Sequence, residues 1–144
     1  MEIKGKLNEL GLNPDNAIII GSGILNALKV RESNDIDVVT TLEKYQSLAL
    51  DSRFKKEIKR GREILVSDLL EIMTSWTVAG IIWTFDNLLE HSAVIDGVRY
   101  NTIQFLLNAK RSWLTNKDVR QKDIDDVKLM ENYLKNGDGQ IRTK

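Results

Sequence analysis

Residues 17–41 read AIIIGSGILNALKVRESNDIDVVTT, and this stretch decides the fold. Its first four residues, Ala17 to Ile20, form a run rich in β-branched side chains that predicts a strand covered on both faces. The triplet Gly21-Ser22-Gly23 breaks that run, and residues 24–30 favour a helix. Residues 35–41 alternate polar and apolar side chains and predict a second strand. The stretch therefore predicts a strand, a glycine turn, a helix and a strand in succession.

Two carboxylates fall on one face of the second of these strands. Alternate residues of a strand share a face, so we expect Asp35 and Asp37 to point the same way, with Cα atoms about 6.5–7 Å apart. Carboxylates this close repel each other unless a cation lies between them. Magnesium, or manganese in its place, prefers such oxygen ligands, and two ions about 3.5–4 Å apart serve in-line phosphoryl or nucleotidyl transfer. The pair is therefore interpreted as a metal site.

The glycine turn adds a feature that suits a phosphate. Gly21 and Gly23 leave backbone N–H groups uncovered at the start of a helix, and the Ser22 hydroxyl lies among them. A Walker P-loop lacks its lysine here, and the dinucleotide fingerprint lacks its third glycine, where Asn26 stands. The alternative is structural: the glycines only permit a tight turn and Ser22 only caps the helix.

The joined turn and acidic strand resemble the nucleotidyltransferase superfamily typified by DNA polymerase β, and in particular its small stand-alone bacterial members. Residues 18–23 match the strand and turn, residues 31–39 match the acidic strand led by an arginine, and residues 70–73 resemble the strand that carries a third acid. Within or near that last strand two acids compete for the role. We choose Glu71 over Asp68, because apolar residues flank Glu71 on both sides, as is typical of a ligand borne by a strand.

The resemblance implies a reaction and the residues that carry it. Asp35, Asp37 and Glu71 would be the catalytic residues and would bind Mg²⁺ or Mn²⁺ ions that bridge the triphosphate of an NTP donor. Ser22 and the glycine amides would hold phosphates. An NMP would pass to a hydroxyl acceptor, which is left open between a protein, an RNA and a small molecule, with release of pyrophosphate. The alternative is an inactive nucleotide-binding or partner-binding module of the same fold, for example an antitoxin-like one.

Several basic residues are further candidates for contacts with the nucleotide. Arg31 is either a surface cation or a partner of the acids or of a phosphate. Lys110 lies on a helix that follows a hairpin and closes over the site, so we include it among the phosphate-binding candidates. The structural alternative assigns it, with Lys122, Asp123 and Asp126, to ion pairs on helix surfaces, because Lys122 and Asp126 stand four residues apart.

The remaining patterns predict an α/β (α+β) fold with a small, mixed and twisted sheet, helices mainly on one side of it and two C-terminal helices. We expect one domain over residues 1–135 and a flexible polar tail over 136–144. The basic stretch at 55–62 is either a loop or a helix end. The expected elements are helices at 2–10, 42–50 and 85–91, strands at 63–67 and 69–74, a hairpin at 93–100, a helix after Thr102 and a last helix at 117–135.

The composition narrows the class of protein. The chain has 144 residues and 42% hydrophobic residues, which fits a single globular domain. Its 21 basic and 21 acidic residues balance, so a strongly basic nucleic-acid binder is not indicated. It has no cysteine, which excludes disulfide scaffolds, zinc ribbons and thiol nucleophiles. With no long apolar run and no signal peptide, we expect a cytoplasmic protein without membrane contact, with a protein partner as an open alternative.

Three other features carry less specific expectations. Trp76, Trp83 and Trp113 belong to the core or stack on a base, and Trp76 is the best stacking candidate because it follows the strand of the third acid. His91 is expected to cap a short helix. The basic run at 55–62 is either a solvated surface or a region that steers an anionic acceptor.

Overall fold

The computed structural model describes residues 3–33, 35–68, 70–115 and 118–142, with side chains described up to residue 136. Its helices are α1 (Ile3–Glu9), α2 (Gly23–Ala27), α3 (Leu42–Ala49), α4 (Phe85–Leu89), α5 (Ile103–Trp113) and α6 (Gln121–Arg142). Its strands are β1 (Ala17–Ile20), β2 (Ile36–Thr40), β3 (Lys55–Lys59), β4 (Arg62–Ser67), β5 (Leu70–Met73), β6 (Ser75–Val78), β7 (Ile81–Thr84), β8 (Ser92–Ile95) and β9 (Val98–Asn101).

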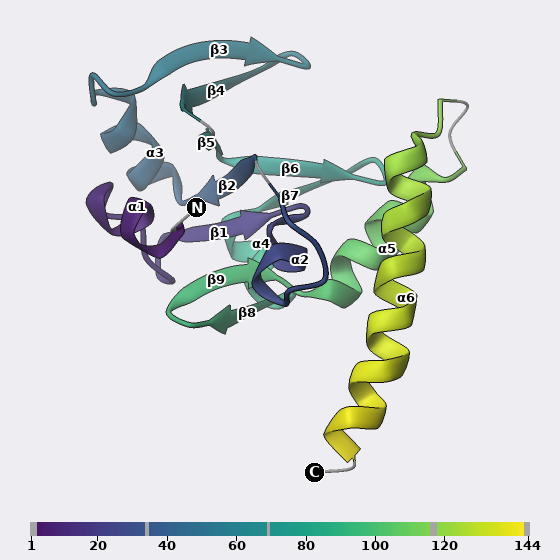
Figure 1. The fold of residues 1–144 in the computed structure, drawn as a ribbon. Coiled ribbons are helices and arrows are strands. Elements are labelled where there is room, and N and C mark those ends of the chain that lie inside the picture. Colours follow the sequence, from purple (N-terminus) through teal and green to yellow (C-terminus); the bar gives the residue numbers. More distant parts are fainter. Residues whose placement is uncertain (1–2, 34, 69, 116–117, 143–144) are drawn as a thin grey trace.

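Seven strands form one mixed sheet in the order β3-β4-β5-β2-β1-β9-β8 (Figure 1). Strand β1 runs antiparallel to β2 and parallel to β9, and β2 runs parallel to β5. Strands β6 and β7 form a separate hairpin. The mixed α+β fold and the mixed sheet expected from the sequence are confirmed.

The register of the central strands places one row of side chains across the sheet. Ile20 of β1 pairs with Asp37 of β2, and Asp37 pairs with Glu71 of β5. Residues paired in this way point to the same face of the sheet. Their neighbours Ile36 and Ile72 point to the opposite face and are fully buried there. The two acids therefore share their face with Val39 and Met73, which lie two residues further along the same strands, and occupy the part of that face where β2 and β5 begin.

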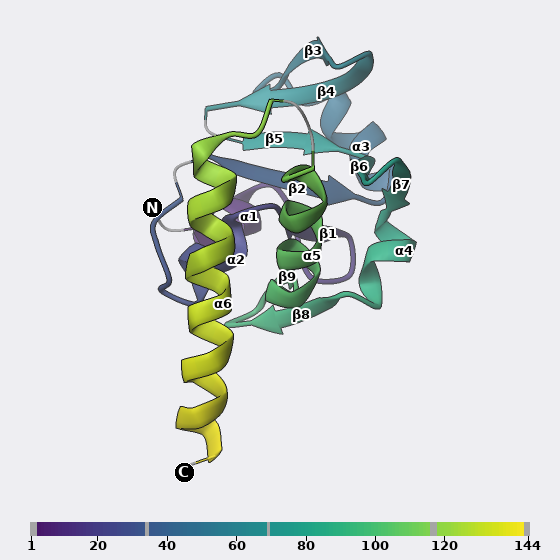
Figure 2. The ribbon, with the colours of Figure 1, turned by 90° about the vertical axis from the view of Figure 1, so that its right-hand side faces the viewer.

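Two apolar clusters cover the two faces of the sheet. Buried residues of α1, α2, α3 and α6 pack on the face of Ile36 and Ile72. Helix α4 packs on the opposite face, where Val78 of the β6–β7 hairpin is also buried. Helix α5 contributes to both clusters, with Leu106 on one side and Phe105 on the other. Figure 2 shows α5 and α6 side by side in front of the sheet.

Most expected elements are confirmed, and the local signals explain them. Thr41, Thr84 and Thr102 each accept a hydrogen bond from the backbone at the start of the helix that follows. The expected hairpin turns at Asp96-Gly97, where both residues have a positive φ, as the tightest hairpin turns require.

Four expectations about elements need comment. Residues 55–59 form a strand, so the expectation of a loop or helix end there is wrong, and the β6–β7 hairpin was not expected. Helix α6 continues to Arg142, beyond the expected end at Lys135. It begins at Gln121 and not near Lys117 as expected, because the described residues 118–120 are not helical; Lys117 itself lies outside the described residues. The strand expected from Leu69 begins at Leu70, since residue 69 is also outside them. No helix in the described part of the chain is long and apolar enough to cross a membrane.

Candidate active site

A cleft of about 390 Å³ opens over the acidic face of the sheet. It lies where β1 ends and where β2 and β5 begin. The turn between β3 and β4 forms one rim, and the start of α6 forms another. The residues that line it are Ile20, Gly21, Ser22, Arg31, Glu32, Ser33, Asp35, Asp37, Lys59, Arg60, Glu71, Trp76, Leu106, Lys110, Trp113, Arg120 and Lys122.

The structure brings the three acids expected at the site into this cleft. Asp37 is half-buried on β2, and Glu71 lies beside it in register on β5. Asp35 is exposed and lies just before the first residue of β2. Asp68 does not line the cleft: its side chain is 75% exposed and pairs with Lys6 at 3.0 Å. The geometry thus groups Glu71, and not Asp68, with the acid pair.

Asp37 is in an unfavourable environment for a negative charge. Burial raises the pKa of Asp37 to about 6, and the neighbouring charges of Glu71 and Asp35 add to the effect. The cations Lys59 and Lys122 work in the opposite direction and lower this pKa, but do not compensate for the rise. A further cation beside Asp37 would relieve this cost.

The side chain of Lys59 forms an ion pair with Glu71. The Lys59 Nζ donates to both carboxylate oxygens of Glu71, at 2.9 and 3.2 Å. Among the described residues, no three carboxylate or histidine side chains converge closely enough to form a metal cluster. The oxygen donors of Asp35 and Asp37 nevertheless have the chemistry that Mg²⁺ and Mn²⁺ prefer. Asp35 and Asp37 therefore fit a divalent cation, and Glu71 lies beside them with its charge paired to Lys59.

The residues of the glycine turn divide into two roles. Gly21 and Ser22 line the cleft, and Gly21 has a φ of +71°, which favours glycine. The Ser22 hydroxyl lies 3.1 Å from that of Ser33 and makes no capping bond, which contradicts the alternative interpretation that Ser22 only caps the helix. Gly23 is buried outside the cleft lining, where its Cα faces Ile19 of β1. Close packing against Ile19 therefore requires glycine at position 23, whether or not its backbone amide also binds a phosphate.

Replacement of Gly23 by alanine is expected to destabilise the fold. The added Cβ would overlap Cγ2 of Ile19, which is itself buried in the central strand. Overpacking of this kind costs about 1–3 kcal/mol. Chemical denaturation of Gly23→Ala and of Ser22→Ala tests this, because loss of the Ser22 hydroxyl removes only its hydrogen bond to Ser33 and should cost less, about 0.5–1 kcal/mol. Equal stabilities for the two variants would contradict the packing argument.

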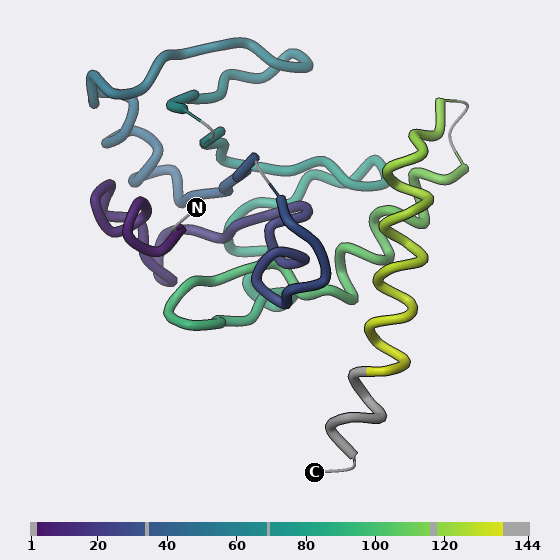
Figure 3. The backbone as a smooth tube through the Cα atoms, in the orientation of Figure 1, coloured from purple at the N-terminus to yellow at the C-terminus, as the bar shows by residue number. Residues whose placement is uncertain are grey.

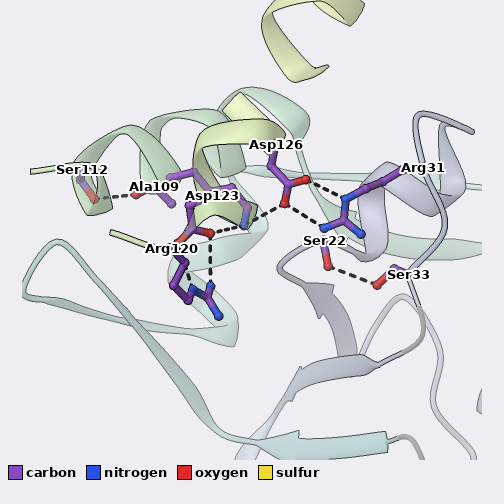
Figure 4. Close-up of polar contacts among 9 residues, drawn as sticks. Ser22, Arg31, Ser33, Ala109, Ser112, Arg120, Asp123 and Asp126 are labelled. Atoms are coloured by element: carbon purple, nitrogen blue, oxygen red, sulfur yellow. Dashed lines mark hydrogen bonds and ion pairs between the residues drawn. The ribbon is translucent and has the colours of Figure 1, made fainter. Parts of the chain in front are cut away.

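A network of ion pairs holds α6 against α5 and against the segment before β2 (Figure 4). Arg31 donates to both oxygens of Asp126, at 2.7 and 2.8 Å. The Nζ of Lys110 lies 2.7 Å from Asp123 and 3.1 Å from Asp126. Arg120 adds two bonds to Asp123. The side chains of Lys110, Asp123 and Asp126 are at most 6% exposed, so the network is buried.

This network corrects the expectation of ion pairs on helix surfaces. The partners of Asp126 are Arg31 and Lys110, and Lys122 is free of Asp126 and lines the cleft instead. Burial works to raise the pKa of Asp126, but the bonds from Arg31 and Lys110 outweigh it and lower that pKa. Arg31 and Lys110 do line the cleft, as expected of phosphate contacts, yet their charged groups are bound to carboxylates of α6.

Two tryptophans form the apolar part of the cleft wall. Trp76 and Trp113 line it, with ring centroids 6.3 Å apart in an edge-to-face arrangement. Trp83 lies outside this wall, in a separate apolar pocket together with His91. The His91 ring packs against Trp83 and Phe105, so its expected role as a helix cap is wrong. Trp76 and Trp113 are thus the tryptophans that can meet a ligand in the cleft.

Sequence reasoning missed three cations at the rims of the cleft. Lys59 and Arg60 lie in the basic run at 55–62 that the sequence analysis identified. No strand was predicted there, so the position of this run relative to the acids could not be inferred. Arg120 gave no signal at all, because its place depends on how α6 packs across the sheet. Four of the six cations in the lining are paired with carboxylates, and Arg60 and Lys122 form no ion pair with a described residue.

Comparison with known proteins supports the fold. No protein-family model matches the chain, and no curated protein sequence matches it. Among solved structures, it is similar to ANT(2″)-Ia, an aminoglycoside nucleotidyltransferase whose crystal structure was determined in complex with adenylyl-2″-tobramycin. The TM-score is 0.57 and the identity 19%, and the match covers 92% of this chain and 86% of that one. The chain therefore has a nucleotidyltransferase-like fold.

Proposed function

We propose that this protein is a metal-dependent nucleotidyltransferase, which moves an NMP from an NTP to a hydroxyl acceptor. The observation that carries the proposal is the convergence of Asp35, Asp37 and Glu71 with the Gly21-Ser22 turn in one cleft. The nucleotidyltransferase-like fold agrees with it. Neither the turn nor the acids alone would specify this chemistry, but their combination matches what phosphoryl transfer requires.

The residues of the cleft have distinct roles in this proposal. Asp35 and Asp37 would hold Mg²⁺ or Mn²⁺, which would neutralise charge on the triphosphate and make its α-phosphorus more electrophilic. The Gly21 amide and the Ser22 hydroxyl bind phosphate oxygens. Arg60 and Lys122, on opposite rims, face the remaining negative charge of the donor. Arg31 and Lys110 are positioning residues, because Asp126 and Asp123 already occupy their charged groups.

The reaction needs one proton acceptor and one leaving group. The acceptor hydroxyl oxygen forms a bond to the α-phosphorus, and the bond from that phosphorus to the bridging oxygen breaks, which releases pyrophosphate. Glu71, once separated from Lys59, accepts the hydroxyl proton. The released Lys59 then lies free at the rim to meet negative charge on a substrate.

Nucleotide binding can be tested before the acceptor is known. A ligand that binds only the folded state raises the melting temperature. We expect a metal-dependent rise with at least one of the four NTPs for the wild-type protein, and none for the Asp35→Asn, Asp37→Asn double variant. No shift with any NTP and metal in the wild type would overturn the proposal, and a shift that persists in the double variant would place the nucleotide elsewhere.

The same assay has a predicted pH dependence. Asp37 has a pKa of about 6 and must lose its proton to bind a metal ion. The nucleotide-induced shift is therefore expected to be small at pH 5 and full at pH 7.5. The Asp68→Asn variant, changed outside the cleft, should keep the wild-type profile.

A further inference from the structure

Positive charge is concentrated in one short segment of a chain that is neutral overall. Residues 53–62 carry six cations and one acid, whereas the rest of the chain carries 15 cations and 20 acids. We name this segment the basic hairpin: it comprises β3, the turn at Arg60-Gly61 and the residues that flank them. Figure 3 shows the backbone of β3 and β4 as an arm that projects from the edge of the sheet. Such segregation of charge creates a local positive field that favours a polyanion.

Three of the six cations of the basic hairpin have no side-chain partner among the described residues, whereas Arg53 pairs with Asp51, Lys59 pairs with Glu71 and Arg62 donates to Ser75. Lys55, Lys56 and Arg60 are exposed and form no ion pair with any other described residue. Lys59 and Arg60 line the cleft, beside the acids. Lys55 stands four residues before Lys59 on the same strand, about 13 Å away along it, and does not line the cleft. The positive charge therefore runs outward from the candidate active site along β3.

Protection of a sheet edge does not account for this charge. Lysines on an edge strand do prevent pairing with other chains, and β3 is an edge strand. The opposite edge strand, β8, has the sequence SAVI and carries no charge. Edge protection also gives no reason for the charge to continue past the turn into the cleft.

The donor nucleotide does not account for it either. The donor's phosphates belong beside the acids and the Gly21-Ser22 turn, and the cations within the cleft face them there. Lys55 and Lys56 lie outside the cleft, at the far end of the strand, so a second, extended anion is needed to reach them.

We propose that the acceptor is a single-stranded nucleic acid, which lies along the basic hairpin and places its 3′-terminal hydroxyl beside Glu71. This inference rests on the proposed function. A basic track together with aromatic side chains is the usual means of binding single strands, and Trp76 and Trp113 supply the aromatic surface in the cleft. The 3′ oxygen attacks the α-phosphorus of the NTP, which adds one nucleotide through a new phosphodiester bond and releases pyrophosphate.

The charge of the cleft argues against a polyamine acceptor of the kind bound by the structural neighbour. The ANT(2″)-Ia structure contains a tobramycin derivative, and tobramycin carries several amino groups. Here three of the four acids of the lining are assigned to the metal and the reaction, and Arg60 and Lys122, which pair with no carboxylate of the described residues, lie on opposite rims. A positively charged acceptor would therefore meet repulsion at both rims.

Binding of a labelled oligonucleotide tests the proposal independently of catalysis. We would measure the fluorescence anisotropy of single-stranded RNA and DNA 12-mers with free 3′ ends, at 50 and 200 mM salt. The Lys55→Glu, Lys56→Glu variant should bind at least about tenfold more weakly than wild type, with a salt slope smaller by about 1.4 for the two lost contacts. The control, Lys128→Glu, Lys135→Glu, makes the same change of net charge at exposed positions of α6 outside the cleft and should bind like wild type.

The results of these experiments distinguish failure of the nucleic-acid acceptor proposal from failure of the proposed nucleotidyltransferase function. The Asp35→Asn, Asp37→Asn variant should still bind the oligonucleotide but fail to extend it by one nucleotide from an NTP with Mg²⁺. If the wild type shows the metal-dependent nucleotide shift but binds no oligonucleotide, the acceptor proposal fails and the proposed function stands. Equal oligonucleotide binding by the hairpin variant and the control, or transfer to tobramycin but not to the oligonucleotides, would also overturn the acceptor proposal.

Discussion

Replacement of Asp37 by asparagine is expected to abolish nucleotidyl transfer and, at the same time, to stabilise the metal-free protein. Asp37 lies on β2 between Ile20 of β1 and Glu71 of β5, with which it is in register. Loss of a metal ligand removes several kcal/mol of transition-state stabilisation, which corresponds to at least about a 10³-fold loss of rate. The same change removes a half-buried charge that the fold accommodates poorly.

The sign of the stability effect follows from the raised pKa. The ordinary aspartate pKa is 3.8, and in the folded protein the pKa of Asp37 is about 6, so the folded state binds the extra proton between these values. Stability falls as the pH rises through this window, and the full cost of the charge is present above pH 6. Asp37→Asn should therefore raise the melting temperature in EDTA clearly at pH 8, less at pH 5 and not at all below about pH 4.

Two measurements check the Asp37 prediction. Transfer from an α-labelled NTP reports the activity, and thermal denaturation in EDTA across this pH range reports the stability. Asp68→Asn is the control, because Asp68 is an exposed acid paired with Lys6 outside the cleft. Retention of wild-type transfer by Asp37→Asn, or loss of transfer by Asp68→Asn, would show that the wrong acids have been assigned.

Replacement of Lys110 by methionine is expected to cost about 3–5 kcal/mol of unfolding free energy. Lys110 is 4% exposed and is the cation between the carboxylates of Asp123 and Asp126. Without it, two buried carboxylates face each other, with only Arg31 and Arg120 as remaining partners. Breaking a buried pair is costly, because it leaves charge uncompensated in a region of low dielectric constant.

The neighbouring residue provides a matched control for Lys110. Arg111 pairs with Glu131 across the same two helices, but both side chains are nearly half exposed. Pairs of this kind contribute at most about 1 kcal/mol. Urea denaturation of Lys110→Met and Arg111→Met therefore compares the loss of a buried cation with the loss of an exposed one. Similar decreases in unfolding free energy for the two variants would contradict the structural role assigned to Lys110. A folded Lys110→Met protein that has lost only its nucleotide-induced thermal shift would instead restore Lys110 as a phosphate contact.

The network also shows where sequence reasoning was limited. Lys110, Asp123 and Asp126 were recognised as charges that pair, since their spacing on helices is visible in the sequence. Their burial could not be predicted from the sequence, because it involves contacts between distant segments: Arg31, which pairs with Asp126, lies 95 positions before it in the chain. Helical spacing instead suggested a pair between Lys122 and Asp126, and tertiary packing placed Lys122 at the cleft. Local charge rules therefore identified the residues and assigned them the wrong partners.

The sequence by itself determined the central strands, the glycine turn and the candidate acids. Short-range patterns predicted strand β1, in which Ile18 and Ile19 are fully buried, and the alternation of side chains around Asp37. Such patterns suffice because strand periodicity assigns each side chain to a face. Tertiary structure alone decided that Glu71 lies beside Asp37, that Lys59 pairs with Glu71, and that Asp68 points elsewhere. These contacts join different strands, and strand order is set by packing of the whole chain, which no local pattern encodes.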